Sequence, residues 1–273
     1  MDKERILITV KTYPTLSKKY GETVCTAGVR PDGTWVRMYP VPFRRLGEPE
    51  QYSKYDWIEC RVARNATDKR PESFRPLDTN ELRAVGHIGT QHEWADRRSL
   101  LLRTARVYDR LDQLTAAAHA NTLSLAVFKP NRVLDFAWQE DERAWEPDRV
   151  RQFREASKQL DLFEDNAWRE TFRLVDKLPY KFSYAFEDAT GTQSKLTILD
   201  WEIGALFWNC LKSSDCDEDR ALTKVRQMYW DQFTTKDLHF FLGTTLAWHS
   251  VAPNPFLIVG VLPIPHERQR GLF

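Results

Sequence analysis

Two strand-like segments joined by a tight turn constrain the fold of this chain more than any other part of its sequence. Residues 22–29 and 34–41 are rich in β-branched and apolar residues and flank Arg30-Pro31-Asp32-Gly33. A Pro-Asp-Gly sequence suits a tight turn, because proline fixes one backbone angle and glycine accepts the left-handed conformation that such turns require. The pattern predicts an antiparallel β-hairpin.

The second strand of this hairpin separates its side chains by type. Successive side chains of a strand point to opposite faces. Trp35, Arg37 and Tyr39 therefore share one face, and Val36 and Met38 share the other. We expect the apolar pair to face the core, and the rings and the guanidinium to face solvent along a cationic channel.

Further cations and rings lie near the hairpin in the sequence. Single-stranded nucleic acid is held by cations that follow its phosphates and by aromatic faces that stack on its bases, each stack contributing about 1–3 kcal/mol. We predict single-stranded DNA or RNA binding by Lys18, Lys19, Tyr20, Trp35, Arg37, Tyr39, Arg44 and Arg45, with Tyr13 and Phe43 as additional rings. The alternative is that Trp35 and Tyr39 pack beneath the second half of the chain, with the stem of Arg37 covering an apolar surface.

Charge is distributed unevenly along the 273 residues. Residues 1–110 hold 21 Lys and Arg against 15 Asp and Glu, whereas the remainder holds 19 against 24, so the net formal charge of +1 conceals a basic half and an acidic half. A basic half attracts a polyanion, which agrees with a nucleic-acid partner.

The later part of the chain has a different order of strand and helix patterns. Strand patterns at residues 180–186 and 195–199 precede helical patterns at 201–212 and 218–233, and strand patterns follow at 238–242 and 256–262. We therefore predict an α+β protein, in which an antiparallel, barrel-like (OB-type) N-terminal half packs with a ββααββ C-terminal half. The predicted divisions are an OB-like basic β domain with inserted helices at 1–138, a charged and partly helical connection at 139–166, and an α+β domain at 167–273.

Strand patterns also occur at residues 124–127 and 133–138, separated by Lys129-Pro130-Asn131. We expect these two segments to pair with each other. Between residues 94 and 120, apolar residues recur at helical spacing and predict one or two helices.

The hairpin sequence resembles a known family. Val24-Cys25-Thr26-Ala27-Gly28-Val29 followed by Gly33-Thr34-Trp35-Val36-Arg37 and Pro40-Val41 is similar to the opening of prokaryotic dual-OB-containing domains, in which a Cys-x-Ala-Gly strand precedes a Gly-x-Trp-hydrophobic-Arg strand. The resemblance covers about the first 45 residues. It implies an OB-type scaffold, a nucleic-acid ligand and a role as a sensor or adaptor in a prokaryotic defence system. Met38 and Tyr39 stand between Arg37 and Pro40, where the family has an Arg-Pro dipeptide.

Acidic residues around position 200 suggest a second kind of function, a metal-dependent nuclease. Asp200, Glu202 and Glu187 would be the catalytic candidates, because carboxylates hold Mg²⁺ in such enzymes. Neither Asp200 nor Glu202 has a lysine two positions away, as the common form of this site requires. Asp200 also stands where the N-cap of the following helix belongs, with Glu202 in its first turn, and we favour that structural role.

The remaining reactive residues give no recognisable catalytic motif. Six histidines are scattered without the spacing of a helical metal site, and we expect His239 and His249 to be structural, with general-base catalysis as the alternative. Gly243-Thr244-Thr245 occupies the position of a ligand-binding turn but lacks the glycine-rich sequence of a phosphate loop. We expect no cofactor and no metal.

The four cysteines and the N-terminal residues indicate the cellular compartment of the protein. Cys25, Cys60, Cys210 and Cys216 match neither a zinc site nor a disulfide framework, and residues 1–5 do not begin a signal peptide. With no apolar run of membrane-spanning length, we predict a cytoplasmic protein. A protein-interaction subunit, partnered within an operon-encoded complex, is the third function class, favoured if exposed aromatic residues of the C-terminal half form a patch.

Overall fold

The predicted hairpin is the centre of the N-terminal sheet. In the computed structural model, which describes residues 2–17, 21–43, 46, 51–161 and 174–267, β3 (Gly21–Val29) and β4 (Trp35–Val41) pair antiparallel with Val29 opposite Trp35. Gly33 closes the turn with φ of 82°, and its N–H donates to the carbonyl of Arg30. The turn chemistry read from the sequence is confirmed.

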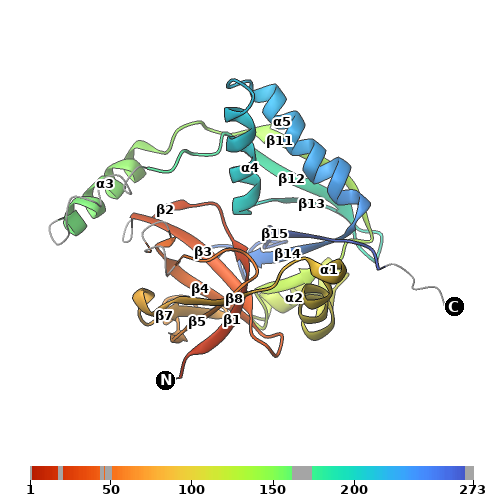
Figure 1. Ribbon diagram of the computed structural model, residues 1–273, viewed down its shortest axis with the longest axis horizontal. Coiled ribbons are helices and arrows are strands. Elements are labelled where there is room, and N and C mark those ends of the chain that lie inside the picture. Colours follow the sequence, from red (N-terminus) through yellow and green to blue (C-terminus); the bar gives the residue numbers. More distant parts are fainter. Residues whose placement is uncertain (1, 18–20, 44–45, 47–50, 162–173, 268–273) are drawn as a thin grey trace.

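Six further strands complete this sheet, which curls strongly in Figure 1. Its order is β6-β7-β4-β3-β1-β5-β8, and β2 pairs with β3 beside this path. The added strands are β1 (Glu4–Lys11), β2 (Thr15–Ser17), β5 (Asp56–Cys60), β6 (Val62–Arg64), β7 (Ser73–Pro76) and β8 (Arg83–His87). All neighbours are antiparallel except β4 and β7.

Both faces of β1 are buried, which explains its continuous apolar sequence. Ile6 and Ile8 point into the curl of the sheet, where they meet Val36, Met38 and other apolar residues of neighbouring strands. Leu7, on the opposite face, packs in a second cluster with Val127 and Phe241. A strand covered on both faces requires apolar side chains throughout, whereas a strand with one face in water alternates.

Two smaller sheets follow. One has the order β15-β14-β10-β9, and the other has the order β11-β12-β13. A bridge between Ile198 and Ile258 brings the two sheets together beside β13 and β15. The strands are β9 (Val107–Tyr108), β10 (Leu125–Phe128), β11 (Arg132–Glu140), β12 (Tyr180–Glu187), β13 (Gln193–Thr197), β14 (Asp237–Thr244) and β15 (Phe256–Ile264).

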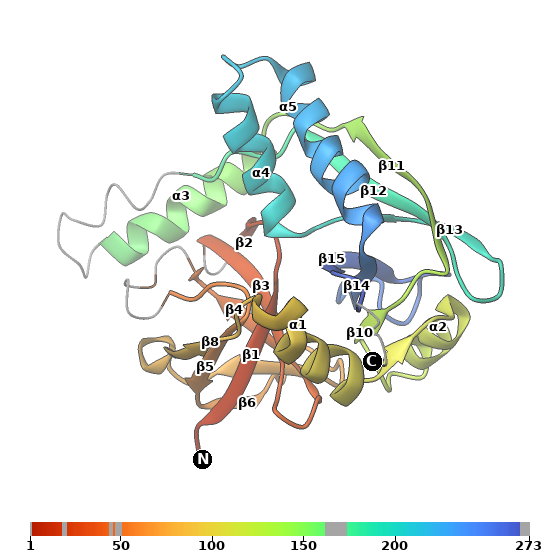
Figure 2. The ribbon, with the colours of Figure 1, turned by 45° about the vertical axis from the view of Figure 1, so that its right-hand side comes forward.

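Two helices pack on the three-stranded sheet within the larger apolar core. Figures 1 and 2 show α4 (Trp201–Lys212) and α5 (Glu218–Arg226) above the three-stranded sheet, and α5 continues as a π-helical turn at Gln227–Gln232. Phe207, Val225 and Tyr229 pack there against rings of β11 and β12. The other helices are α1 (Gln91–Arg98), followed by a π-helical turn at Ser99–Thr104, α2 (Leu111–His119) and α3 (Pro147–Asp161).

Short 3₁₀ turns lie at Thr79–Glu81 and Phe233–Thr235. The α+β class and the ββααββ order after residue 167 are therefore observed, and α4 has the bounds that the sequence predicted. The predicted connection at 139–166 contains α3, and its residues from 162 on lie outside the described part of the chain.

The predicted pairing of residues 124–127 with 133–138 is wrong. β10 pairs with β14 and β9, whereas β11 pairs with β12, so the two neighbouring strands enter different sheets. Both sheets consist mainly of C-terminal strands, so β9–β11 pair with those strands and not with the N-terminal sheet. Local patterns identify strands, but the partner of a strand depends on buried faces that are distant in sequence.

Within the described residues, no helix is long and apolar enough to cross a membrane.

Candidate ligand-binding cleft

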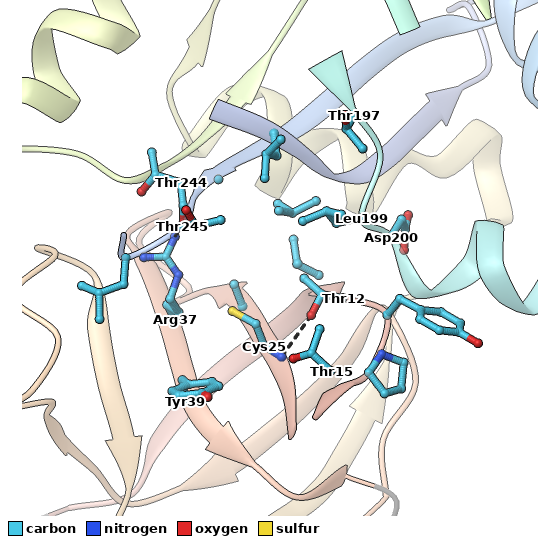
Figure 3. Close-up of a pocket in the computed structure, with 18 of the residues that line it drawn as sticks. Thr12, Thr15, Cys25, Arg37, Tyr39, Thr197, Leu199, Asp200, Thr244 and Thr245 are labelled. Atoms are coloured by element: carbon cyan, nitrogen blue, oxygen red, sulfur yellow. Dashed lines mark hydrogen bonds between the residues drawn. The ribbon is translucent and has the colours of Figure 1, made fainter. Parts of the chain in front are cut away.

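A cavity of about 550 Å³ lies between the curled N-terminal sheet and β13–β15 (Figure 3). We call this cavity the cleft. Apolar side chains from both sides line it together with polar groups, and Figure 3 shows Arg37 and Asp200 at opposite ends. Its main lining residues are Val10, Thr12, Tyr13, Cys25, Ala27, Arg37, Tyr39, Asp68, Arg70, Leu125, Trp145, Lys177, Tyr180, Lys181, Thr197, Leu199, Asp200, Thr244, Thr245, Leu257 and Val259.

Arg37 lies at one end of the cleft and is only 1% exposed. Its guanidinium donates to the hydroxyl of Ser124 at 2.7 Å, to the carbonyl of Ser124 at 3.1 Å and to the carbonyl of Thr244 at 3.4 Å. Burial, and then the neighbouring charge of Arg70, lower the pKa of Arg37 from its ordinary value. An arginine stays protonated in proteins, so a full positive charge is buried here.

Arg70 brings a second guanidinium to the same end of the cleft. It pairs with Asp68 at 2.6 Å and also donates to the carbonyl of Thr244, the group that Arg37 contacts. Although burial opposes ionisation of Asp68, hydrogen bonds from Arg70 and Ser73 lower its pKa to about 2. Asp68 is therefore ionised at neutral pH and balances Arg70.

His249 supports this end from behind. Its Nδ1 lies 2.9 Å from the hydroxyl of Thr244, and its Nε2 lies 3.0 Å from the side-chain oxygen of Asn121. Burial, and then the charges of Arg70 and Arg37, lower the pKa of His249, so the ring is neutral at pH 7. A neutral ring adds no further charge beside the two guanidinium groups.

The other end of the cleft holds Asp200, which Figure 3 shows across the cavity from Arg37. Asp200 caps α4 by accepting from the N–H of Glu202, as the sequence predicted. It also forms a buried ion pair of 2.7 Å with Lys54, which lies 3.0 Å from Glu202. Burial alone would lower the pKa of Lys54, but Asp200 and Glu202 raise it above its ordinary value. The arrangement is a satisfied structural pair.

Residues flanking α3 form a third wall of the cleft. Lys177 and Lys181 lie 3.6 and 2.9 Å from the carboxylate of Asp141. Trp145 and Tyr180 add aromatic rings to this wall, and the phenol of Tyr13 donates to a carbonyl of the same segment. Rings and cations therefore line the cleft from both halves of the chain.

Comparisons with known families divide the chain into two regions, one before and one after about residue 105. A family model described as a domain of unknown function (DUF8758) matches residues 2–103, and a second, also described as a domain of unknown function (DUF8757), matches residues 106–273, more than half of the chain. The chain belongs to the DUF8757 family. The search of curated proteins found no match.

Among solved structures, the chain is similar to a murine DNA-binding protein bound to double-stranded DNA. The identity is 9%, the alignment covers 98% of this chain and 99% of that one, and the TM-score is 0.32. The DUF8757 region supplies Thr244 and Thr245 to the cleft, and the DUF8758 match supplies Arg37 and Arg70. We call the end of the cleft that holds Arg37 and Arg70 the arginine end. It is assembled only when both regions are in contact.

The structure corrects the expected exposure of the hairpin face. Trp35, Arg37 and Tyr39 do share one face, but β10 and β14 cover Trp35 and Arg37, whereas Tyr39 borders the cleft. Trp35 is half-buried and packs edge-on against Phe241, with ring centroids 5.8 Å apart. An open cationic channel does not run along this strand, because the Trp35 ring buries more apolar area by packing beneath the second sheet and Arg37 is buried beside it.

The predicted binding residues divide into three groups. Tyr13, Arg37 and Tyr39 line the cleft, whereas Trp35 does not, and Phe43 is buried beside Tyr52. The remaining five lie outside the described residues, namely Lys18, Lys19, Tyr20, Arg44 and Arg45.

The three carboxylates of the nuclease alternative are not brought together. Glu187 contacts Asn131 and Arg132 at the end of β12, where it lies opposite Gln193 at the start of β13. Asp200 follows the other end of β13, and the extended chain between Gln193 and Asp200 spans about 20 Å. Within the part of the chain that the structure describes, no group of three His, Cys, Asp or Glu residues could hold a metal ion. His239 is buried in β14, in agreement with the structural role expected for it.

Sequence reasoning missed Arg70, Asp68 and Thr245. Residues 65–78 are mostly polar and contain proline, and nothing in their local pattern shows that they fold back toward β14. The Gly243-Thr244-Thr245 turn was noticed, but as a failed phosphate loop. The signal that could have been followed was its position at the end of the largely apolar run Leu238–Leu242, which forms the buried part of β14.

Proposed function

We propose that this chain binds single-stranded nucleic acid, DNA or RNA, and that one nucleotide of the strand enters the cleft. The observation that carries the proposal is Arg37, a buried cation that faces the cleft and has no carboxylate in ion-pair contact among the described residues. A buried charge without a counter-ion is unfavourable, and an anionic ligand would relieve that cost.

The size and lining of the cleft support the same proposal. Its volume of about 550 Å³ falls within the ~300–1,000 Å³ that is usual for small-ligand sites. Tyr13, Tyr39 and Trp145 bring aromatic rings to the cleft, and bases stack on such rings without strong sequence preference. Lys181 is half-exposed beside them and suits a phosphate of the strand outside the cavity.

Two finer features of the proposal come from the resemblance of the first 45 residues alone. These are an OB-type identity for the curled sheet and a role as a sensor or adaptor in a prokaryotic defence system. An OB-type sheet would agree with the proposal, because such sheets commonly bind oligonucleotides.

Fluorescence anisotropy with labelled mixed-sequence DNA and RNA oligonucleotides tests the proposal. We expect binding at low salt that weakens steeply as salt rises, because counter-ions are released from the strand. Lys181→Ala should weaken binding several-fold and reduce the salt slope. Lys195→Ala is the matched control, because it removes an exposed lysine from the neighbouring strand β13 outside the cleft lining.

Replacing Tyr39 with leucine tests the stacking part of the proposal. Loss of one base–ring stack should cost about 1–3 kcal/mol of binding free energy. Absence of any anisotropy change with the unmodified protein at low salt would refute nucleic-acid binding.

A second candidate function, binding of a protein partner, is favoured by the loop between β14 and β15. Leu246, Trp248 and Val251 are exposed by 54%, 61% and 69% and lie within six residues of one another. Large apolar side chains exposed together often mark a partner surface. Light scattering after size exclusion should show self-association that Trp248→Ser reduces, if the partner is a second copy of this chain.

A further inference from the structure

The side chains that line the arginine end of the cleft carry one more positive than negative charge. This end comprises Arg37, Asp68, Arg70, Thr244 and Thr245. Asp68 neutralises Arg70 through direct hydrogen bonds, whereas Arg37 contacts only the neutral groups of Ser124 and Thr244. One positive charge is therefore left without a paired carboxylate in the described structure.

The nearest acidic group in this network reaches Arg37 only indirectly. Glu72 accepts from the N–H and the hydroxyl of Ser124, at 3.0 and 2.5 Å, and that hydroxyl accepts from Arg37. Glu72 therefore orients Ser124 behind the guanidinium and does not occupy the side of Arg37 that borders the cleft. Glu72 does not line the cleft, whereas Arg37 does.

Thr245 adds an independent sign of a missing ligand. Its hydroxyl oxygen is buried without a hydrogen-bond partner, and the residue lines the cleft next to Thr244. Figure 3 shows both threonines beside the guanidinium of Arg37. Buried hydroxyl groups are nearly always hydrogen-bonded, so an unpartnered one that borders a cavity points to an acceptor or donor supplied from outside.

We propose that the arginine end is a phosphate site, which holds the terminal phosphate monoester of a nucleic-acid strand or of a mononucleotide. The inference rests on the proposed function, because the rest of the ligand would occupy the apolar and aromatic part of the cleft. Arg37 and Arg70 are donors suited to phosphate oxygens, and Thr245 supplies a hydroxyl.

A terminal phosphate fits better than an internal one. Arg37 is held against the buried main chain of Ser124 and Thr244, so a strand cannot continue past it. A monoester ends the chain at this point and carries up to two negative charges, whereas an internal diester carries one and needs room on both sides.

The test compares three oligonucleotides of one sequence: unphosphorylated, 5′-phosphorylated and 3′-phosphorylated. We expect one phosphorylated form to bind about tenfold more tightly or better, which corresponds to about one to two charge-assisted hydrogen bonds. An unphosphorylated oligonucleotide that is longer by two nucleotides controls for the added charge. The matching mononucleotide, and inorganic phosphate against chloride at equal ionic strength, are tested by thermal shift.

Thr245→Val is the informative variant, because it removes a hydroxyl without a partner and should not impair folding. We expect it to reduce the preference for the phosphorylated end by at least threefold. Thr9→Val is the matched control, since Thr9 also has a buried hydroxyl without a partner but does not line the cleft. Arg37→Lys, which retains the charge and loses the paired donors, should abolish the preference if it folds.

Each outcome separates this inference from the proposed function. Oligonucleotides that bind equally with and without a terminal phosphate would overturn the phosphate site and leave nucleic-acid binding intact. If no oligonucleotide binds, the proposed function fails. The phosphate site is then supported only if the mononucleotide stabilises the unmodified protein and the Thr245→Val variant loses that stabilisation. It is refuted if either result is missing.

Discussion

His239 is a buried, neutral histidine that should make stability depend on pH. Its ring is 3% exposed, and its Nδ1 lies 3.0 Å from the carbonyl of Asp237. Burial, and then the nearby charges of Lys129 and Arg98, lower the pKa of His239 to about 3. The unfolded chain, with an ordinary histidine pKa near 6.5, therefore binds a proton that the folded chain does not accept.

The stabilisation is present above pH 6.5 and decreases as pH falls toward 3. We expect protonation linked to His239 to lower the free energy of unfolding by up to about 5 kcal/mol as the pH falls from 6.5 to 3. Urea unfolding at several pH values would measure it. His239→Gln should flatten the dependence, while the exposed control His266→Gln should leave it unchanged; an equal slope in all three proteins would contradict the assignment.

At the scale of single residues, the sequence was informative where the cause is local. Asp200 was predicted as an N-cap because capping depends only on the residues that follow it. Its partner Lys54 lies 146 positions away, so no spacing rule could have found the ion pair. The strand face on which Arg37 lies was predicted for the same local reason. The strands that cover this face, β10 and β14, could not be predicted in this way.

Among the elements, the β3–β4 hairpin depends on its turn glycine. Gly33 has φ of 82°, and a Cβ there would lie 2.8 Å from the carbonyl carbon and oxygen of Thr104. Gly33→Ala should therefore reduce the free energy of unfolding by about 2 kcal/mol, from the backbone conformation and the close contact together.

Two other glycines separate these causes. Gly191 also has positive φ, at 81°, but open space around its Cβ position, and Gly86 has open space and no positive φ. Chemical denaturation should rank Gly33→Ala as most destabilising, Gly191→Ala as intermediate and Gly86→Ala as nearly neutral. A Gly33→Ala protein as stable as the Gly86→Ala protein would show that the turn tolerates a side chain.

Element positions were easier to predict than element partners. The bounds of α4 follow from an N-cap and a helical period, both of which can be read within twelve residues. The partner of β10 could not be read in this way, since its register with β14 joins residues more than a hundred positions apart. A three-residue connector favoured pairing with β11, but burial against β14 determines the sheet.

On the scale of the whole molecule, the two family-matched regions share a core. Leu7, Val10 and Ala27 of the first region pack with Val127 and Phe241 of the second. The α+β class was visible in the sequence, but the cleft was not, because it exists only where these regions meet.

The shared core predicts that neither region is stable alone. Fragments 1–105 and 106–273 would each expose this apolar surface, so we expect poor solubility or binding of a hydrophobic dye. The intact chain should unfold in one transition, with tryptophan fluorescence and circular dichroism giving the same midpoint. Two separate transitions, or a soluble first fragment with a sharp transition of its own, would argue against this coupling.

Cys25 has a further consequence. Its thiol is half-buried, is not part of a disulfide, and is drawn in Figure 3 on the floor of the cleft beside Thr12 and Thr15. Cys25 lines the cleft, so a ligand bound there would shield this sulfur from alkylating reagents. The rate at which Cys25 is labelled, in a protein whose exposed Cys216 has been replaced, therefore reports directly how often the cavity is filled.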